Sequence, residues 1–432
     1  MTHSTGGWPA GILMLSRLRW VLPAVIWLIP LHCQCWRPAE VYLWAAREIR
    51  SGEFGPHAYD DAAVSQEIGR ITRGQVRDIL SPTPPTMPLF ILPLTFLSPP
   101  WLGLSWGLGI LLALLSAALL VLGALRYSRS KLPLAGMAAA ALLVSAPMQL
   151  NIARGQVYHW LLLFFAAGLY GLATADRRGR TANGVAVGGP AWDWLAGLSL
   201  ALAVLWKLAG WPVWLVLAVR GRWRVLGQAG AITAVVVLLS LPWIGLDTWW
   251  RFAHDVVPGW LGSPTVMIPA YQTFNGLIQH LFRYDAQWNP APLVDAPALG
   301  VLFSALGTIG LVSATVLLAR RTPLLQAVGA GLLLTILLAP VAEQHHYLIA
   351  FIPFLVAVEC WSRRPERWTA LLLVASAMLL FAPLPYNNPA LWKGWKAVLA
   401  YPRVWGGLLL WIILFSLVRK RTARTTSGNG VA

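Results

Sequence analysis

Long apolar runs follow one another along most of this chain, and short polar or basic segments separate them. Runs of about 20 apolar residues are typical of helices that cross a bilayer. Candidate spans lie at 20–34, 101–125, 132–149, 156–175, 192–206, 208–219, 225–244, 298–319, 323–341, 347–361, 368–383 and 401–418. The pattern predicts an all-α polytopic membrane protein with about twelve transmembrane helices, forming a single transmembrane domain over residues 1–432.

Two long polar segments interrupt the spans, at about 35–86 and about 245–297, and a basic tail covers residues 419–432. The first segment holds seven of the sixteen acidic residues. The second is rich in Trp, Pro and Asn, and its amphipathic pieces predict helices that dock at the membrane interface. We expect the reactive chemistry in the first, acidic segment.

The charges are distributed unevenly between the two sides of the predicted membrane. Basic clusters occupy every second connection, which is typical of the cytoplasmic side. They contain 20 of the 33 Lys and Arg residues: Arg17, Arg19, Arg126, Arg129, Lys131, Arg177, Arg178, Arg180, Arg220, Arg222, Arg224, Arg320, Arg321, Arg363, Arg364, Arg367, Arg419, Lys420, Arg421 and Arg424. The long acidic segments then face the non-cytoplasmic side. A net charge of +17 is explained by these anchors, so no nucleic acid is expected as a partner.

The apolar stretch 191–219 is too long for one crossing of the predicted topology and too short for two. Two passes of about 14 residues would each reach roughly 21 Å, against a hydrocarbon thickness of roughly 30 Å. We expect a helical hairpin that stops within the outer leaflet, with Lys207, Gly210 and Pro212 at its tip. Non-helical backbone at that depth is tolerated where it lines a protein cavity.

The N-terminal apolar run resembles a signal peptide but lacks a small-x-small cleavage site, so we expect it to remain as the first helix. The three cysteines form no disulfide framework, because Cys33 and Cys35 are two residues apart and Cys360 is distant. No metal site is expected. The adjacent His345 and His346 also lack the i, i+4 spacing of a helical metal pair.

The first polar segment supplies the candidates for a general base. Glu40 follows the first span closely, so its carboxylate could deprotonate a sugar hydroxyl at the membrane boundary. It could instead pair with Arg37 or Arg47 on the surface. Asp60 and Asp61 compete for the catalytic role, although an Asp at this place can also cap the helix expected near Ala62.

The remaining candidates are substrate-binding groups that the topology brings to the same outer side. Lys207 interrupts an apolar stretch, where an ionised group requires a partner, and a phosphate is the natural anion. Arg154 would contact the same phosphate across the cavity. An arginine whose charged end reaches the membrane interface would also explain its position in this short turn. One of the two histidines would donate to phosphate or sugar. The full set is Arg154, Gln156, Lys207, Gln272, Asn275, Glu343, His345, His346 and Tyr347.

Short motifs recur in an order that resembles glycosyltransferase family 87. They are V-Y-x-x-A-A-R at 41–47, G-x-x-x-Y-D at 55–60, G-Q at 155–156, A-G with the following Lys207, Q-x-x-N-G-L at 272–277 and A-P-x-x-E-x-H-H-Y at 339–347. The family's catalytic Asp precedes the V-Y pair, where this chain has Pro38, Ala39 and Glu40. Glu40 is the nearest carboxylate to that position.

The resemblance implies a GT-C fold and an inverting transfer from a polyprenyl-phosphate sugar donor to a lipid or glycan hydroxyl. The sugar is a hexose, expected to be mannose, and the site faces the non-cytoplasmic side of the plasma (inner) membrane. No cofactor is expected, and the sequence has no P-loop or Rossmann glycine pattern. A polytopic transporter or a lipid flippase without transferase activity is the alternative, although a transporter would show paired broken helices in two related halves.

Overall fold

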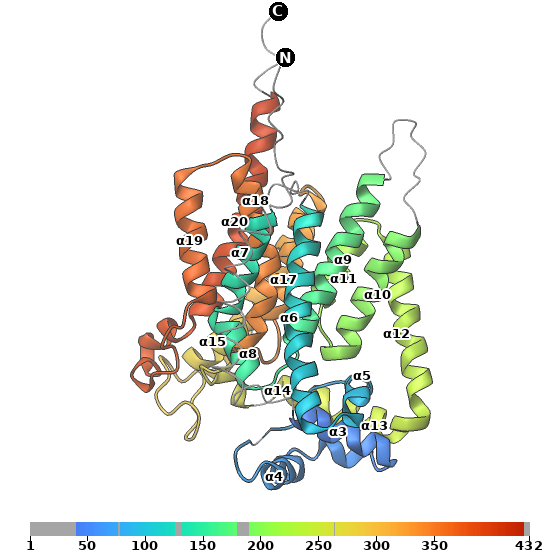
Figure 1. Ribbon diagram of the computed structural model, residues 1–432. Helices are drawn as coiled ribbons and strands as arrows, with labels where there is room; N and C mark the ends of the chain where they lie inside the picture. Colours follow the sequence, from blue (N-terminus) through green and yellow to red (C-terminus); the bar gives the residue numbers. More distant parts are fainter. Residues whose placement is uncertain (1–39, 77, 126–131, 179–189, 263, 427–432) are drawn as a thin grey trace, which may run out of the picture.

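The computed structural model describes residues 40–76, 78–125, 132–178, 190–262 and 264–426. The predicted first span, with Cys33 and Cys35, lies outside these residues, as do the basic residues of segment 126–131. The described chain is helical and contains no β-strand, only an isolated bridge between Asp285 and Asn289. Figure 1 shows an upright helical bundle with several short helices lying across its lower end.

Each predicted span after the first coincides with a helix or a pair of helices. The longer helices are α6 (Pro99–Ala124), α9 (Tyr158–Arg178), α10 (Pro190–Lys207), α12 (Trp223–Ile244), α16 (Pro297–Ala319) and α20 (Pro402–Thr426). The shorter ones are α7 (Leu132–Leu143), α8 (Ala146–Ala153), α11 (Trp211–Val219), α17 (Leu324–Leu337), α18 (Phe351–Ser362) and α19 (Arg367–Phe381).

The smaller elements belong to the polar segments between these helices. The first segment forms α3 (Glu40–Ser51), η1 (Pro56–Tyr59) and α4 (Asp61–Ile71), and α5 (Met87–Ile91) and η2 (Leu92–Phe96) follow it before α6. The second forms α13 (Leu246–Arg251), the single π-helical turn η4 (Phe252–Val256), α14 (Val257–Gly262), η5 (Pro264–Met267) and α15 (Phe274–Phe282). Three more short helices are η6 (Gln344–Ala350), η7 (Pro389–Leu391) and η8 (Gly394–Ala400).

The described chain has five helices that are long and apolar enough to cross a membrane, or up to six if η8 and α20 count as one bent span. The all-α polytopic class is therefore confirmed, whereas the number of about twelve crossings is not. Several predicted spans are short helices or broken pairs. The bend between η8 and α20 is 61°, so η8 runs at a steep angle to the helix that follows it.

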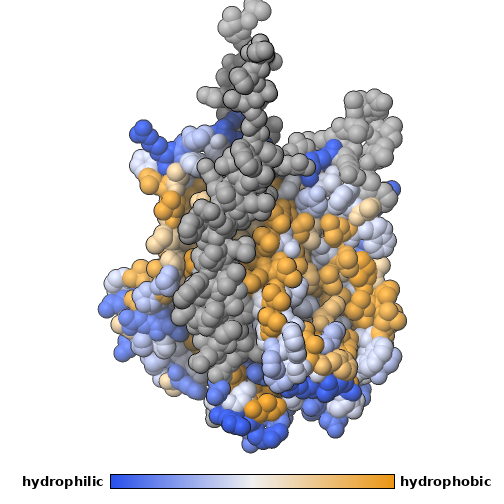
Figure 2. All heavy atoms as spheres, in the orientation of Figure 1, coloured by the Kyte–Doolittle hydropathy of each residue, from blue (hydrophilic) through white to orange (hydrophobic). Residues whose placement is uncertain are grey.

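The helices differ in how much of their apolar surface other helices cover. In α9, 72% of the most apolar window is buried, compared with 17% in α12 and 11% in α16. Leu239 in α12 and Ile309 in α16 are 65% and 62% exposed. Figure 2 shows the resulting apolar belt between two hydrophilic ends. Such a belt is expected to face lipid, so α9 is a central helix and α12 and α16 are peripheral.

Helices α9, α10 and α12 stand side by side in Figure 1, and glycines allow their close approach. A Cβ atom at Gly171 in α9 would lie 2.8 Å from the carbonyl oxygen of Trp192 in α10. A Cβ atom at Gly197 in α10 would lie 2.8 Å from Cβ of Gln228 in α12. Any larger residue at these two positions would push the helices apart.

Arginines hold the helix ends together at the end of the bundle opposite the small helices. Arg222, just before α12, forms a 2.6 Å ion pair with Asp176 in α9. Arg177 donates to the carbonyl oxygens of Gly123 and Ala124 at the C-terminal end of α6, at 3.2 Å each. These basic residues meet at one end of the bundle, as the distribution of charge along the sequence predicted.

The first polar segment packs across the other end, which we call the loop end. In Figure 1, α3, α4, α5 and α13 lie there together. Arg50 in α3 donates to the carbonyl oxygen of Thr95 in η2 at 2.7 Å. The hydroxyl of Thr86 donates to the carbonyl oxygen of Leu205 at 2.7 Å. The polar segment is thus anchored directly to the end of α10, where Lys207 lies.

Candidate active site

The predicted hairpin tip is present, and it places Lys207 at the loop end. Helix α10 ends at Lys207, and α11 begins at Trp211 after a turn in which Leu208 and Gly210 have φ of 50° and 101°. Glycine suits the left-handed conformation because it has no Cβ. Helix α11 has nine residues, which span only about 14 Å. The chain therefore reverses within the bundle, as its apolar pattern predicted.

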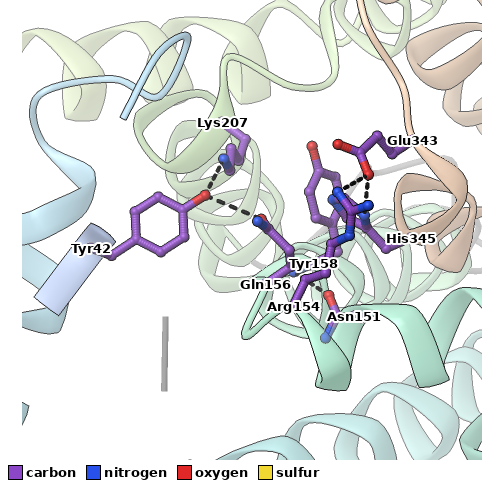
Figure 3. Close-up of polar contacts among 8 residues, drawn as sticks. All are labelled: Tyr42, Asn151, Arg154, Gln156, Tyr158, Lys207, Glu343 and His345. Atoms are coloured by element: carbon purple, nitrogen blue, oxygen red, sulfur yellow. Dashed lines mark hydrogen bonds and ion pairs between the residues drawn. The ribbon is translucent and has the colours of Figure 1, made fainter. Parts of the chain in front are cut away.

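The Lys207 ammonium joins the first polar segment to the tip. Its Nζ donates to the hydroxyl of Tyr42 in α3 at 2.6 Å and to Oγ1 of Thr83 at 2.9 Å. The Tyr42 hydroxyl in turn donates to Oε1 of Gln156 at 3.2 Å. Figure 3 shows the bonds that join Lys207 to Tyr42 and Tyr42 to Gln156. Two of the three ammonium donors are used in it, which leaves a third for a bound anion.

Aromatic rings continue from Lys207 towards the histidines. The ammonium lies 4.9 Å from the ring centroid of Tyr42 and 6.0 Å from that of Tyr158. The Tyr158 ring lies 4.1 Å from the His346 ring and 5.0 Å from the His345 ring, centroid to centroid. Tyr158 therefore stands between the cation and the two histidines, which was not predicted from the sequence.

The two histidines have polar atoms without partners. Nδ1 of His345 and Nδ1 of His346 are buried and make no hydrogen bond within the described residues. The Nδ1 atom of His345 lies 3.8 Å from the Glu343 carboxylate, beyond hydrogen-bonding distance. Buried polar atoms usually have a partner, so these two nitrogens are exceptions among the described residues.

Arg154 and Glu343 form an ion pair in the same region. The guanidinium Nη1 lies 2.6 Å from a Glu343 carboxylate oxygen, although the residues are 189 positions apart. The pKa of the Glu343 carboxyl is raised above its ordinary value, mainly because of burial. The charge of Asp78 also raises it, whereas Arg154 and Lys207 lower it. The Arg154 side chain remains 53% exposed, so part of the guanidinium faces open space.

Asn151, another residue not singled out from the sequence, holds the turn that carries Arg154 and Gln156. Its buried side chain accepts from the backbone N–H of Tyr158 at 3.1 Å and lies 3.2 Å from Nδ1 of His159. Its carbonyl accepts from the backbone N–H of Gln156 at 2.8 Å. A polar residue within an apolar run was the signal in the sequence that could have identified it.

The predicted carboxylates of the first polar segment occupy different environments. Glu40 is the first residue of α3 and is half-buried. Asp60 is exposed and accepts from the backbone N–H of Ala63, so it caps α4. Asp61 is half-buried, and its Oδ1 atom is buried without a hydrogen-bond partner among the described residues. Burial raises the pKa of its carboxyl, whereas the nearby Ser81 side chain lowers it.

Asp78 is a further carboxylate of this segment, and its charge interacts with the site. Its side chain accepts from the backbone N–H of Ile79 at 2.9 Å. Burial raises the pKa of Asp78, whereas the Ile79 bond, Lys207 and Arg154 lower it. Burial and the charge of Asp78 also raise the pKa of Tyr42, so its hydroxyl remains protonated and able to donate. From the sequence, Asp78 was noted as one of the seven acidic residues of this segment and was not selected as a site residue.

Two predicted substrate-binding residues, Gln272 and Tyr347, make hydrogen bonds within the protein. Both amide protons of Gln272 are donated to backbone carbonyls, those of Pro269 and Ala400, at 2.6 and 2.7 Å. The Tyr347 hydroxyl donates to the carbonyl oxygen of Gln272 at 2.6 Å. These bonds connect the second polar segment to η6 and η8. Asn275 is half-buried near the start of α15.

The described residues include no cluster of three or more His, Cys, Asp or Glu that could hold a metal ion. The site instead combines a lysine, an arginine paired with a glutamate, two histidines and nearby carboxylates. Cations and uncharged donors of this kind are suited to binding an anionic group and to stabilising negative charge as it develops.

No curated protein and no solved structure matches the chain. The model for glycosyltransferase family 87 matches residues 83–342. This segment begins at Thr83, which accepts from Lys207, and ends one residue before Glu343. It includes Arg154 and Gln156. Because it covers more than half of the 432 residues, the chain belongs to glycosyltransferase family 87 and is a membrane glycosyltransferase, as its motifs predicted.

Proposed function

We propose that this protein transfers a hexose, expected to be mannose, from a polyprenyl-phosphate donor to a hydroxyl of a lipid or glycan acceptor. The acceptor oxygen attacks the anomeric carbon, and polyprenyl phosphate leaves from the opposite side, which inverts the configuration. A carboxylate of the first polar segment takes the proton. The reaction takes place at the loop end, on the non-cytoplasmic face of the plasma membrane.

The observation that carries the proposal is the environment of Lys207. A buried or half-buried ammonium requires a partner in a bilayer-embedded protein. Its two present partners, Tyr42 and Thr83, are uncharged. A phosphate oxygen at the third donor would supply the missing negative charge. A lipid-linked phosphate would also reach this depth, because the hairpin tip lies within the bundle.

Arg154 and the histidines would complete the binding of the donor. Arg154 has further guanidinium donors besides the one paired with Glu343, and it can contact a second phosphate oxygen. The unpartnered Nδ1 atoms of His345 and His346 would bond the phosphate or the sugar hydroxyls. Donors placed where the leaving phosphate gains charge stabilise the transition state more than the ground state.

Of the remaining candidates, some would contact the substrate, and others hold the loops that surround the site. Gln156 would contact the substrate, or hold Tyr42 in place through its 3.2 Å bond. Gln272 and Tyr347 support the loops that surround the site. Asn275 remains a candidate contact to the acceptor. Glu40, Asp60 and Asp61 remain candidates for the base because they share a polar segment with Tyr42.

The test uses the purified full-length protein in lipid nanodiscs, with radiolabelled polyprenyl-phosphate mannose and a membrane lipid extract as the source of acceptors. Lys207→Met is compared with Lys393→Met, a change at an exposed lysine next to η8. Methionine keeps the approximate length of the lysine side chain and removes its charge. We expect Lys207→Met to lower kcat/KM by about 10²–10³-fold and Lys393→Met to have little effect.

The results of this experiment distinguish sugar transfer from the flippase alternative. Full activity of Lys207→Met would overturn the assignment of Lys207 to the phosphate. Absence of transfer by the unmodified protein, with mannosyl and other hexosyl polyprenyl-phosphate donors, would overturn the proposed donor. If the same protein instead moved a fluorescent polyprenyl phosphate across vesicle membranes, the flippase alternative would be favoured.

A further inference from the structure

We propose that Arg403 is a positioning residue for the candidate site, and that it holds η6 in the place where His345 and His346 can meet the substrate. The inference rests on the proposed role of the two histidines and names a residue that acts on them from outside the site. Arg403 lies near the start of α20. It belongs to none of the motifs of the family resemblance and lies outside the matched segment 83–342.

The Arg403 side chain is completely buried and is the largest fully buried side chain among the described residues. Its guanidinium donates to the carbonyl oxygens of Leu379 and Ala382 at 2.6 Å each and to Oε1 of Gln344 at 3.1 Å. All three acceptors are uncharged, and Nε has no partner among the described residues. Burying a cation costs free energy unless hydrogen bonds replace its water, so these three bonds constrain the elements that supply them. Because no part of the side chain is exposed, Arg403 acts on the site through these partners and does not touch substrate.

Two of the bonds fix Arg403 to the end of α19. Leu379 lies in the last turn of that helix, and Ala382 follows its last residue. Carbonyl oxygens at a helix C-terminus lack partners within the helix, and a cation is favourable beside them. Arg403 is the second residue of α20. The end of α19 and the start of α20 therefore form one fixed base.

The third bond connects this base to the site. Gln344 is buried, is the first residue of η6 and directly precedes His345. The Nη2 atom that donates to Gln344 also donates to Ala382, so Gln344 is held close to the end of α19. A shift of Gln344 would carry His345 and His346 with it, because the three residues are consecutive in one short helix.

Gln272 holds the same turn from its other side. Its backbone N–H donates to the carbonyl oxygen of Ala342 at 2.7 Å, and its carbonyl oxygen accepts from the Tyr347 hydroxyl at 2.6 Å. Its Oε1 atom accepts from the backbone N–H of Arg403 at 3.2 Å. Residues 342–347 are therefore fixed at both ends, by hydrogen bonds that lead back to Arg403.

The bend between η8 and α20 brings Arg403 to this place. The two helices meet at 61°, and the side chain of Gln272 bridges them. Its Nε2 atom donates to the carbonyl oxygen of Ala400 on the η8 side at 2.7 Å, and its Oε1 atom accepts from Arg403 on the α20 side. The bend and the turn that carries the histidines are thus parts of one hydrogen-bonded unit.

The experiment breaks the bond between Arg403 and Gln344 from each side. Arg403→Met removes all three side-chain bonds, whereas Gln344→Leu removes one acceptor and leaves the contacts of Arg403 with α19. Gln344→Glu keeps an acceptor oxygen at the same place and is the conservative variant. The matched control is Arg177→Met, since Arg177 also donates to carbonyl oxygens at a helix C-terminus, but at the opposite end of the bundle.

The placement of the histidines is measured without substrate. The purified full-length protein in lipid nanodiscs is treated with diethyl pyrocarbonate, and the modified histidines are quantified by peptide mass spectrometry. We expect modification of the peptide with His345 and His346 to rise in Arg403→Met and Gln344→Leu, and to rise in neither Gln344→Glu nor Arg177→Met. The exposed His57 should react equally in every variant, and the buried His159 should stay protected. Unchanged reactivity of His345 and His346 in both disruptive variants overturns the inference, as does a rise that includes His159.

Transfer from polyprenyl-phosphate mannose shows the consequence for function. We expect Arg403→Met and Gln344→Leu to lower kcat/KM by about 10–10²-fold, mainly through a higher KM for the donor, because misplacing a binding group by about 1 Å has effects of this size. Gln344→Glu should retain more activity than Gln344→Leu. In a protein that already carries His345→Ala and His346→Ala, Arg403→Met should cause no further kinetic loss.

A full additional loss in that background would overturn the inference, because Arg403 would then act by a route that does not include the histidines. Absence of transfer by the protein without substitutions would overturn the proposed function alone. The reactivity of His345 and His346 would still decide whether Arg403 positions them.

Discussion

The Lys207 ammonium donates a 2.6 Å hydrogen bond to the Tyr42 hydroxyl, although the two residues are 165 positions apart in the chain. One lies in the first polar segment and the other at the tip of a broken helix pair. The bond therefore joins the predicted reactive loop to the predicted phosphate site. Its neighbours Thr83 and Gln156 extend the same network.

Tyr42→Phe should weaken donor binding while leaving the fold intact. The change removes one acceptor of Lys207 and the donor to Gln156, and a hydrogen bond to a charged group contributes about 1.5–3 kcal/mol. We expect kcat/KM to fall by about 10–100-fold. Tyr284→Phe, at an exposed tyrosine of the second polar segment, is the matched control. Equal activity of the two variants would contradict a functional role for the Tyr42 hydroxyl.

Arg154 and Glu343 should behave as a coupled pair. In a double-mutant cycle of Arg154→Gln and Glu343→Gln, we expect the losses of thermal stability or activity to be non-additive by about 0.5–3 kcal/mol. The exposed pair of Arg70 and Glu67, with a 2.6 Å contact, serves for comparison. It should show much weaker coupling, because solvent screens it. Additive effects at Arg154 and Glu343 would show that the two side chains are not energetically coupled.

Asp61→Asn should stabilise the folded protein at neutral pH. Burial raises the pKa of the Asp61 carboxyl in the folded state, so folding favours its protonated form. The corresponding stabilisation is fully present below the unfolded pKa and is lost as the pH rises through the folded pKa. Asparagine is neutral at every pH, so its advantage should be present at pH 7 and disappear near pH 4. Thermal unfolding at several pH values measures the difference.

Asp60 directly precedes Asp61, and its substitution should change stability for a different reason, because its side chain caps α4. Asp60→Ala removes the side chain that caps α4 and should cost about 1 kcal/mol, whereas Asp60→Asn should cost little because asparagine also caps helices. Thermal unfolding of the two variants checks this. A large loss of stability in Asp60→Asn would mean that the negative charge, and not the cap, is what the fold requires.

Gly197→Ala should destabilise the bundle because the added methyl group meets α12. Its Cβ would lie 2.8 Å from Cβ of Gln228, and overpacking of this kind costs about 1–3 kcal/mol. Gly227→Ala in α12 is the control, since an added Cβ there has no neighbour within 4 Å. Thermal unfolding in detergent should separate the two. A Gly197→Ala variant as stable as the control would show that the helices can adjust.

Much of the fold could be predicted from local pattern. The apolar runs predicted the helices from α6 to α20, and the break at Lys207 and Gly210 follows from a run that was too long for one crossing and too short for two. The number of crossings was not confirmed, because several apolar runs form short helices or pairs. Hydropathy reports which residues avoid water, not whether a helix is continuous.

Part of the polar network at the candidate site was singled out from the sequence. Lys207, Arg154, Gln156, Glu343, His345 and His346 were singled out and lie in one network with Tyr42 and Tyr158. Gln272 and Tyr347 were expected to meet the substrate, which stays a prediction; in the structure they bond the backbone of neighbouring loops. Asp78 was not selected, because a carboxylate in an acidic loop has no distinguishing local signal. Its significance depends on which cations lie close to it.

The amino-acid sequence by itself determined the helical membrane class, the family and the separation of acidic and basic ends, because hydropathy, charge and motif order are properties of short segments. Only the tertiary structure decided which polar side chains face one another. Tyr42 meets Lys207, and Arg154 meets Glu343, because the bundle brings together segments distant in the chain. Contacts of that kind depend on packing between helices, and no local pattern encodes them.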